Sequence, residues 1–443
     1  MTEKELNLES YTFVEKIKVV EKYEPEKPHI KDKLKGSLAN LQFTDLSDYI
    51  SESPVIRKSF MSDKWDSKIE ILIDNNWYGF GENNIYIDYY KFVNKLQTFN
   101  SFDQKLSIDY LNEKILLWII KVFINKKSEY DLIQYLDELT SKDVKAITFY
   151  YPILNLQIEE PFKIGDVHIT YFEKKYFDDL LKKLHGENPK QEKIEIFDKT
   201  YRKYQGRVFI AVKVTAENKK GEEIAYNKAC LVTDIIKLLS PTIGFPDWKC
   251  STDLDKRIPF ESEYLSIDQD NKYGFSISKS ANNNHFDISN QMKKDFEPML
   301  NLFSKILSYQ GKKEIENTIL KSIKFFSKSL SENDLHLRIS QLIMIIESIF
   351  LLETENYKME KKCKRRMCDL LYKNDGIKKQ KLFDVLTNMY EIRHSMTHKS
   401  IKKYIEQKKL REFQVNIIET FTRLIGLSPK IDTMKILIKN LDK

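Results

Sequence analysis

The chain has 443 residues, of which 41% are hydrophobic and 31% are charged, and its formal net charge is +7. This length exceeds what one compact core usually holds, so two domains are expected. The composition is that of an ordinary globular protein and excludes a fibrous, low-complexity or intrinsically disordered chain.

Apolar segments are too short for a membrane protein. The longest apolar run, Ile115 to Ile124, is interrupted by Lys121, and it is about half as long as a helix that crosses a bilayer. The N-terminal sequence MTEKELNLES is acidic and polar, without the basic and apolar segments of a signal peptide. The sequence therefore predicts a cytoplasmic protein without a membrane partner.

Residues 1–288 are predicted to form a mixed, largely antiparallel α+β domain. The first sixty residues are polar and contain three prolines, which favours irregular structure or short strands. Stretches rich in β-branched and aromatic residues predict strands at 83–90, 146–151, 168–172, 207–216 and 274–280. Between them, apolar residues at helical spacing predict helices at 109–126, 128–141, 174–185 and 223–239.

Residues 289–443 are predicted to form an all-α helical bundle, because strand-like alternation ends there and apolar residues recur every three and four positions. Helices are expected at 289–310, 313–330, 333–352, 357–373, 377–396 and 401–425. Asn374-Asp375-Gly376 is typical of a turn, and Leu427-Ser428-Pro429 is typical of a helix end.

The segment from Arg338 to Leu352 is apolar on nearly every side and is the predicted central helix of the bundle. Glu347 lies inside it. A carboxylate in apolar surroundings is costly unless it is paired, so we expect a cation or a polar group beside it. A purely structural pair and a supporting role near an active site are both open.

Positive charge is concentrated between Lys358 and Lys381, a segment that contains ten lysines and arginines but only three acidic residues. A concentrated positive face is typical of proteins that bind RNA or DNA. The alternative is a solvated helix face in a lysine-rich chain. The candidate nucleic-acid-binding residues are Lys361, Lys362, Lys364, Arg365 and Arg366.

The four cysteines do not form a metal-binding pattern. Cys230, Cys250, Cys363 and Cys368 include no Cys-x-x-Cys pair, and no histidine lies near either pair at zinc-ligand spacing. They are interpreted as reduced structural thiols, and no metal or cofactor is expected.

The hexapeptide Arg393-His394-Ser395-Met396-Thr397-His398 follows the amphipathic run KLFDVLTNMYEI. Arg393 and His398 are five residues apart, so a regular helix would not place them on one face. A local break or a helix end, which Ser395 and Thr397 favour, would bring both side chains to a common surface.

From about Ile319 to Ser400 the chain resembles the HEPN superfamily, and within it the Apea-like HEPN proteins of bacterial antiviral and abortive-infection systems. The helix LRISQLIMIIESIFLL and the segment MYEIRHSMTHKS carry the likeness. Arg393, His394 and His398 match the family's R-x4-6-H signature, in which a polar residue follows the arginine. The signature occurs once in this chain, and Ser400 stands where one toxin branch carries a tyrosine.

The resemblance implies a metal-independent endoribonuclease of an antiviral or toxin system, with Arg393, His394 and His398 in catalytic roles and Glu347 in support. Because the chain carries one copy of the signature, it implies a homodimer through the C-terminal domain, with two motifs in one composite cleft that cuts RNA. Residues 1–288 would act as a recognition or sensor domain that responds to a phage-derived trigger or an antitoxin.

Two other functions stay open. A catalytically silent HEPN module would bind nucleic acid or a protein partner on the same bundle. An effector gated by a cyclic nucleotide would need an anion pocket in the N-terminal domain, for which the sequence contains no motif.

Overall fold

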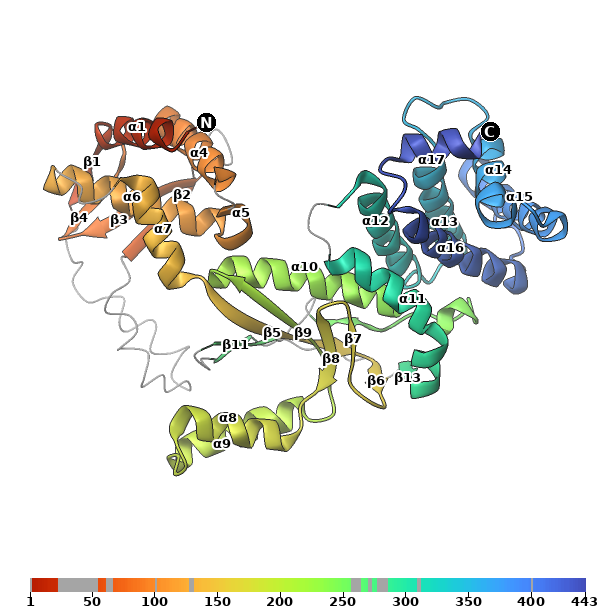
Figure 1. The fold of residues 1–443 in the computed structure, drawn as a ribbon, viewed down its shortest axis with the longest axis horizontal. Helices are drawn as coiled ribbons and strands as arrows, with labels where there is room; N and C mark the ends of the chain where they lie inside the picture. Colours follow the sequence, from red (N-terminus) through yellow and green to blue (C-terminus); the bar gives the residue numbers. More distant parts are fainter. Residues whose placement is uncertain are drawn as a thin grey trace. The chain divides into compact units, whose positions relative to one another are not determined.

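A strand-rich N-terminal region precedes a helical C-terminal region in the computed structural model (Figure 1). The structure describes residues 2–22, 55–60, 67–99, 102–126, 131–255, 264–269, 273–276, 286–308, 312–399 and 401–443. The chain forms two compact units: residues 1–145 with 215–221, and residues 146–214 with 222–443.

The first unit contains a four-stranded antiparallel sheet of order β1-β4-β3-β2 with helices packed on it. Its strands are β1 (Ile17–Lys22), β2 (Val55–Phe60), β3 (Ser67–Ile73) and β4 (Asn76–Phe80). Its helices are α1 (Glu3–Val14), α4 (Asn83–Gln97), α5 (Phe102–Lys105), α6 (Ile108–Asn125) and α7 (Leu132–Asp143). Aromatic rings fill the core, where Phe13 contacts Phe80, Tyr89 and Phe92.

Two expectations for this region were wrong. α1 was not predicted, although Thr2 and Glu5 form a capping box at its start. The strand predicted at 83–90 is the first half of α4. Its buried residues Tyr86, Tyr89, Phe92, Val93 and Leu96 recur at helical spacing, and packing of this face overrides the β-propensity of its aromatic and β-branched residues.

Other expectations for the first unit were confirmed. α6 occupies the helix predicted at 109–126, and α7 occupies most of the one predicted at 128–141, of which 128–130 lie outside the described residues. Most of the predicted irregular stretch, residues 23–54, also lies outside them.

The second unit contains a largely antiparallel sheet in the order β12-β11-β5-β9-β8-β7, with β10 paired to β5. β6 and β13 form a separate parallel pair. The strands are β5 (Lys145–Leu154), β6 (Leu156–Ile158), β7 (Phe162–Ile164), β8 (Val167–Tyr171), β9 (Val208–Ala216), β10 (Asp253–Leu254), β11 (Tyr264–Asp268), β12 (Tyr273–Ser276) and β13 (Phe286–Ile288).

Strands predicted at 146–151, 168–172 and 207–216 are therefore confirmed as β5, β8 and β9. The one predicted at 274–280 is confirmed as far as residue 276, beyond which the predicted residues are not described. The helices beside this sheet are α8 (Lys174–His185), α9 (Gln191–Tyr204), α10 (Asn218–Lys237) and the short 3-10 helix η2 (Pro241–Ile243). α8 and α10 were predicted, whereas the polar α9 was not.

The C-terminal helices follow the predicted order closely. They are α11 (Asn290–Ser308), α12 (Glu314–Ser329), α13 (Leu335–Phe350), α14 (Met359–Tyr372), α15 (Gly376–Lys399), α16 (Gln407–Leu427) and α17 (Met434–Leu441). The predicted turn at Asn374-Asp375-Gly376 separates α14 from α15. α16 begins six residues after the predicted start, and α17 was not expected.

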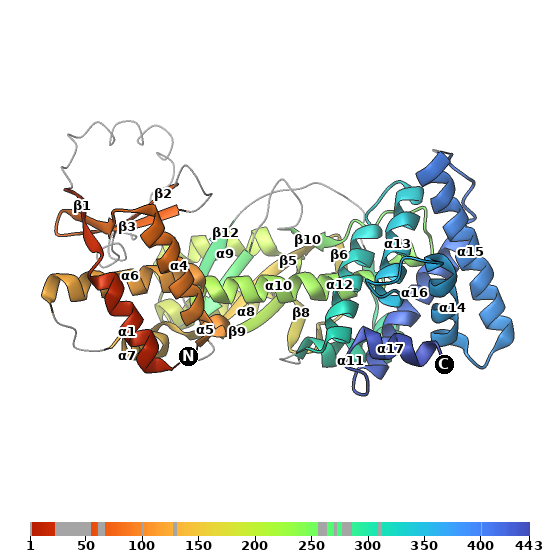
Figure 2. The same cartoon turned by 90° about the horizontal axis from the view of Figure 1, so that it is seen from above.

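The strands end at β13 and the helical region begins at α11, which is where the sequence placed the boundary between 288 and 289. The two compact units divide elsewhere, however, because the second sheet and the C-terminal helices share one hydrophobic core. Ile210 of β9, Ile236 of α10, Ile323 of α12 and Ile346 of α13 all belong to it. In Figures 1 and 2 the C-terminal end of α10 lies beside α12.

Candidate functional site

One part of the candidate site is an ion pair between α13 and α15. Nη1 of Arg393 donates to Oε1 of Glu347 at 2.6 Å, with 30% of the arginine side chain and 18% of the glutamate side chain exposed. α13 buries Ile343, Ile346 and Phe350 in the core, so Glu347 lies on the flank of the helix that meets α15. The predicted cation beside Glu347 is thereby confirmed as Arg393.

His394 and His398 lie next to each other on the last turns of α15. They are four residues apart, which places them on one helix face, and their ring centroids are 4.5 Å apart with an angle of 46° between the rings. Both side chains are exposed. The structure thus presents two imidazoles side by side at the surface.

The predicted break between Arg393 and His398 is absent, because α15 continues through both residues to Lys399. The Thr397 hydroxyl donates to the Arg393 carbonyl at 2.8 Å, so it bonds back along the helix without interrupting it. Five residues of helix turn the chain by about 500°, which leaves Arg393 and His398 about 140° apart around the axis. Arg393 therefore faces α13, while His398 faces away with His394.

The helix end lies just beyond the motif. The backbone N–H of Ile401 donates to the Ser395 carbonyl at 3.1 Å, across the end of α15. Such a bond closes the last turn and satisfies a carbonyl that the helix itself leaves unpaired. His398 therefore sits in the final turn of α15.

Groups beneath the ion pair are held in their neutral forms. Burial, the charge of Glu347 and the neighbouring Cys363 raise the pKa of Tyr390 well above its usual range. Burial raises the pKa of Cys363 and of Cys368 to about 12, and all four cysteines are unbridged. Neither Cys363 nor Cys368 is a thiolate near neutral pH, which agrees with their interpretation as structural thiols.

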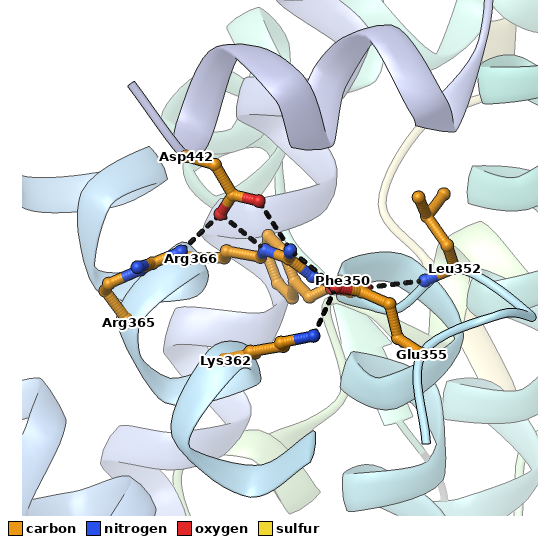
Figure 3. Close-up of polar contacts among 7 residues, drawn as sticks. All are labelled: Phe350, Leu352, Glu355, Lys362, Arg365, Arg366 and Asp442. Carbon is orange, nitrogen blue, oxygen red and sulfur yellow. Dashed lines mark hydrogen bonds and ion pairs between the residues drawn. The ribbon is translucent and has the colours of Figure 1, made fainter. Parts of the chain in front are cut away.

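The basic stretch on α14 is not the continuous positive surface that the sequence suggested. Figure 3 shows the Arg366 guanidinium enclosed between two carboxylates. It donates to Glu355 at 2.6 and 2.9 Å, to Asp442 at 2.6 and 2.9 Å, and to the Phe350 carbonyl at 2.7 Å. Only 2% of its side chain is exposed, so Arg366 is an interior residue and cannot contact a polyanion on this surface.

Three of its neighbours are also paired. Arg365 contacts Asp442, and Lys362 bonds to Glu355 at 2.7 Å. Lys364 is buried, bonds to Glu360 at 2.6 Å and to Thr387 at 3.1 Å, and lies over the Phe383 ring. Of the five candidates, Lys361 is exposed and forms no ion pair with another described residue. Three acids from outside this stretch, Glu355, Glu412 and Asp442, pair with its basic residues and offset part of its excess charge.

The Arg366 contacts, and to a smaller extent the bond from Lys362, hold the pKa of Glu355 down at about 2. Its carboxylate is therefore charged throughout the physiological range. Asp442 reaches this cluster from the end of α17, so the network fastens the last helix to α14 and to the loop after α13. Its role is to hold the bundle together.

In the described ranges between residues 2 and 443, no group of three or more His, Cys, Asp and Glu side chains is placed to hold a metal ion. No helix in the same ranges is long and apolar enough to cross a membrane.

No family model, curated protein or solved structure matches this chain. Its function is therefore inferred from the chemistry and placement of its own side chains.

The structure also brings together residues that the sequence did not single out. Lys321, Lys324 and Lys328 of α12 line a cavity whose opposite wall is α10. Their spacing of three and four residues places them on one helix face. The spacing of the lysines is visible in the sequence. The opposite wall is not, because it is formed by α10, whose residues lie about ninety positions earlier in the chain.

Proposed function

We propose that residues 289–443 form a HEPN-type domain and that the chain is a metal-independent endoribonuclease of a bacterial antiviral or toxin system, acting on RNA in the cytoplasm. The observation that supports this most is the exposed cluster on the last turns of α15, where His394 and His398 are adjacent and Arg393 is anchored by Glu347. Acid–base groups and a fixed cation are what phosphodiester cleavage requires.

The reaction that fits this cluster is attack of a ribose 2′-hydroxyl on the adjacent phosphate. One group removes the hydroxyl proton and another protonates the leaving 5′-oxygen. An imidazole can both accept and donate a proton, so His398 can act as base or acid, and His394 can orient the phosphate or the neighbouring ring. Arg393 stabilises the negative charge that gathers on the phosphorane.

The ion pair with Glu347 is compatible with this role. A guanidinium carries five N–H donors, and the bond to Glu347 uses one of them on Nη1. The remaining donors can bind a phosphate while the carboxylate limits rotation of the side chain. Glu347 is therefore proposed as a positioning residue.

A homodimer through the C-terminal helices completes the proposal, since each chain contributes one Arg393–His398 pair. Exposed apolar side chains occur on α13 and in the segment after α15: Leu337 and Met344, and Ile401 and Tyr404. A bond of 2.8 Å between His336 and the Lys403 carbonyl holds that segment against α13. Light scattering should report a dimer, and a monomer that cleaves RNA at the full rate would contradict this part of the proposal.

The rival function is a silent module that binds RNA or a protein partner. Two observations favour it: α15 is continuous, so Arg393 and His398 point in different directions, and Arg393 already has a structural partner. In that case the motif stabilises the bundle and performs no chemistry.

Arg393 separates the two functions. Replacing it by lysine keeps the charge but removes the planar fork, so Arg393→Lys should lose about as much activity as Arg393→Ala, on the order of 100-fold or more. The measurement is growth and total RNA integrity during induced expression in a bacterial host, with and without phage challenge. Arg411 is exposed on the outer face of α16, so Arg411→Ala is the matched control and should behave as wild type. Equal toxicity of all variants at equal abundance would favour the silent module.

The α+β part of the chain is proposed to keep the nuclease inactive until a phage-derived trigger binds or an antitoxin is released. The shared core between the second sheet and the C-terminal helices supports this, because a change in one can reach the other through contiguous packing. Constitutive RNA cleavage by the full chain, unchanged by phage infection, would contradict this regulatory role.

A further inference from the structure

A groove lies between α10 and α12 in the second compact unit. Its volume is about 740 Å³, which lies within the range of about 300 to 1,000 Å³ that small-molecule sites occupy. Leu231 of α10 and Leu320 of α12 contribute apolar surface on opposite walls. The groove is separate from the Arg393–His398 site, whose residues do not line it.

The floor of the groove is rigid because its polar groups are bonded to one another. The Ser327 hydroxyl donates to Asp234 at 2.7 Å, and both residues are at least 98% buried. Nζ of Lys237, whose residue is 1% exposed, bonds to Asp253 at 2.5 Å. These contacts join α10 to α12 and to β10, so the cavity is formed before any ligand arrives.

The α12 wall carries uncompensated positive charge. Lys321, Lys324 and Lys328 are exposed, and none of them forms an ion pair with another residue in the described part of the chain. Exposed lysines alone are usual on a helix. These three, however, are stacked along a cavity, where like charges one turn apart repel each other and a bound anion would relieve the repulsion.

An aromatic surface lies beside these lysines. Phe325 follows Lys324 on the same wall and is 60% exposed, and Tyr226 faces the groove from α10. A single exposed phenylalanine is ordinary on a protein surface; Phe325 is informative because it lines the groove together with the lysines. Flat apolar surface beside cations matches a ligand that has a planar ring at one end and negative charge at the other.

We propose that this groove binds a nucleotide, with its phosphates on Lys321, Lys324 and Lys328 and its base against Phe325. The site is independent of the proposed ribonuclease activity, since it involves neither the same residues nor the same helix. A ligand there would join α10, which flanks the sheet, to α12, which packs in the C-terminal bundle.

Calorimetric titration of the full chain with ATP, GTP, CTP and UTP in turn tests the proposal. At least one should bind once per chain, and the triple variant Lys321→Ala, Lys324→Ala, Lys328→Ala should weaken it by about tenfold or more. The matched control, Lys174→Ala, Lys175→Ala, Lys183→Ala on exposed α8, removes the same charge elsewhere and should bind as wild type. Failure of all four nucleotides to bind, or equal loss in both triple variants, would overturn the proposal.

The role of the ring is tested with Phe325→Ala and with tripolyphosphate. Loss of the stacking partner should weaken nucleotide binding by about tenfold, and tripolyphosphate should bind more weakly than the nucleotide by a similar factor. Equal affinity for tripolyphosphate and nucleotides would reduce the groove to an anion patch. Binding of a short single-stranded RNA, lost in the lysine variant while nucleotides do not bind, would assign the groove to RNA instead.

Cys230 reports on occupancy directly. It lines the groove and is partly exposed, whereas Cys250, Cys363 and Cys368 are buried. A bound nucleotide should slow alkylation of Cys230 by a maleimide, and this protection should vanish in the lysine variant while the unliganded rate stays unchanged. Protection that persists in that variant would place the ligand elsewhere.

Discussion

Replacing His398 by alanine should lower the rate of RNA cleavage by about two to four orders of magnitude, because a positioned acid–base group contributes that factor. The side chain is exposed on the last turn of α15 and buries no partner. The variant should therefore fold as wild type, with a change in stability within about 0.5 kcal/mol. Cleavage of a labelled RNA by purified protein gives the rate, and circular dichroism checks the fold.

His168→Ala is the control for this substitution. His168 is exposed on β8 and is not part of the Arg393–His398 cluster, so its replacement should leave the rate unchanged. His394→Ala should have a smaller effect than His398→Ala if it orients the phosphate. Wild-type activity of the His398→Ala protein would show that His398 is an ordinary surface residue.

Replacing Arg366 by alanine should lower the free energy of unfolding by about 3 to 5 kcal/mol, the usual effect of breaking a buried ion pair. Arg366 is the main reason why the pKa of Glu355 is as low as about 2. Without Arg366 this pKa should rise toward the ordinary value of a glutamate, which is still far below 7, so the carboxylate would remain charged without its main partner. The substitution also leaves the Phe350 carbonyl without its donor. In a unit of this size the melting temperature should fall by roughly 10 °C, measured by calorimetry.

The neighbouring arginine provides a matched control. Arg365 also contacts Asp442, but half of its side chain is exposed. Exposed pairs contribute about 0 to 1 kcal/mol, so Arg365→Ala should shift the melting temperature by only a few degrees. If both substitutions have the same effect, the enclosed position of Arg366 has no energetic consequence and the network does not hold the bundle together.

Local patterns predicted most of the helical region well because its longer helices carry apolar residues at helical spacing. The spacing of apolar residues located α11 to α15 within a few residues, and it identified Glu347 as a carboxylate that needs a cation or a polar partner. The same rules failed at residues 83–90, where aromatic and β-branched residues suggested a strand. Burial of one helical face decided that segment, and burial depends on parts of the chain that a local window does not contain.

The candidate site was predictable only in part, for the same reason. The sequence supplied Arg393, His394 and His398, but not the direction in which each side chain points. Ser395 and Thr397 suggested a break, yet the Thr397 hydroxyl bonds back to the Arg393 carbonyl and the helix continues through both residues. Arg366 appeared to belong to a basic surface because its partners Glu355 and Asp442 are 11 and 76 residues away in the chain.

The most direct test of the proposed ribonuclease site is incubation of the purified full chain with single-stranded RNA in excess EDTA, followed by mapping of the fragment ends. Attack by the 2′-hydroxyl predicts fragments with 2′,3′-cyclic phosphates and 5′-hydroxyls from the wild-type protein, and intact RNA with His398→Ala. Intact RNA with the wild-type protein, or the same fragments from His398→Ala, would contradict the account.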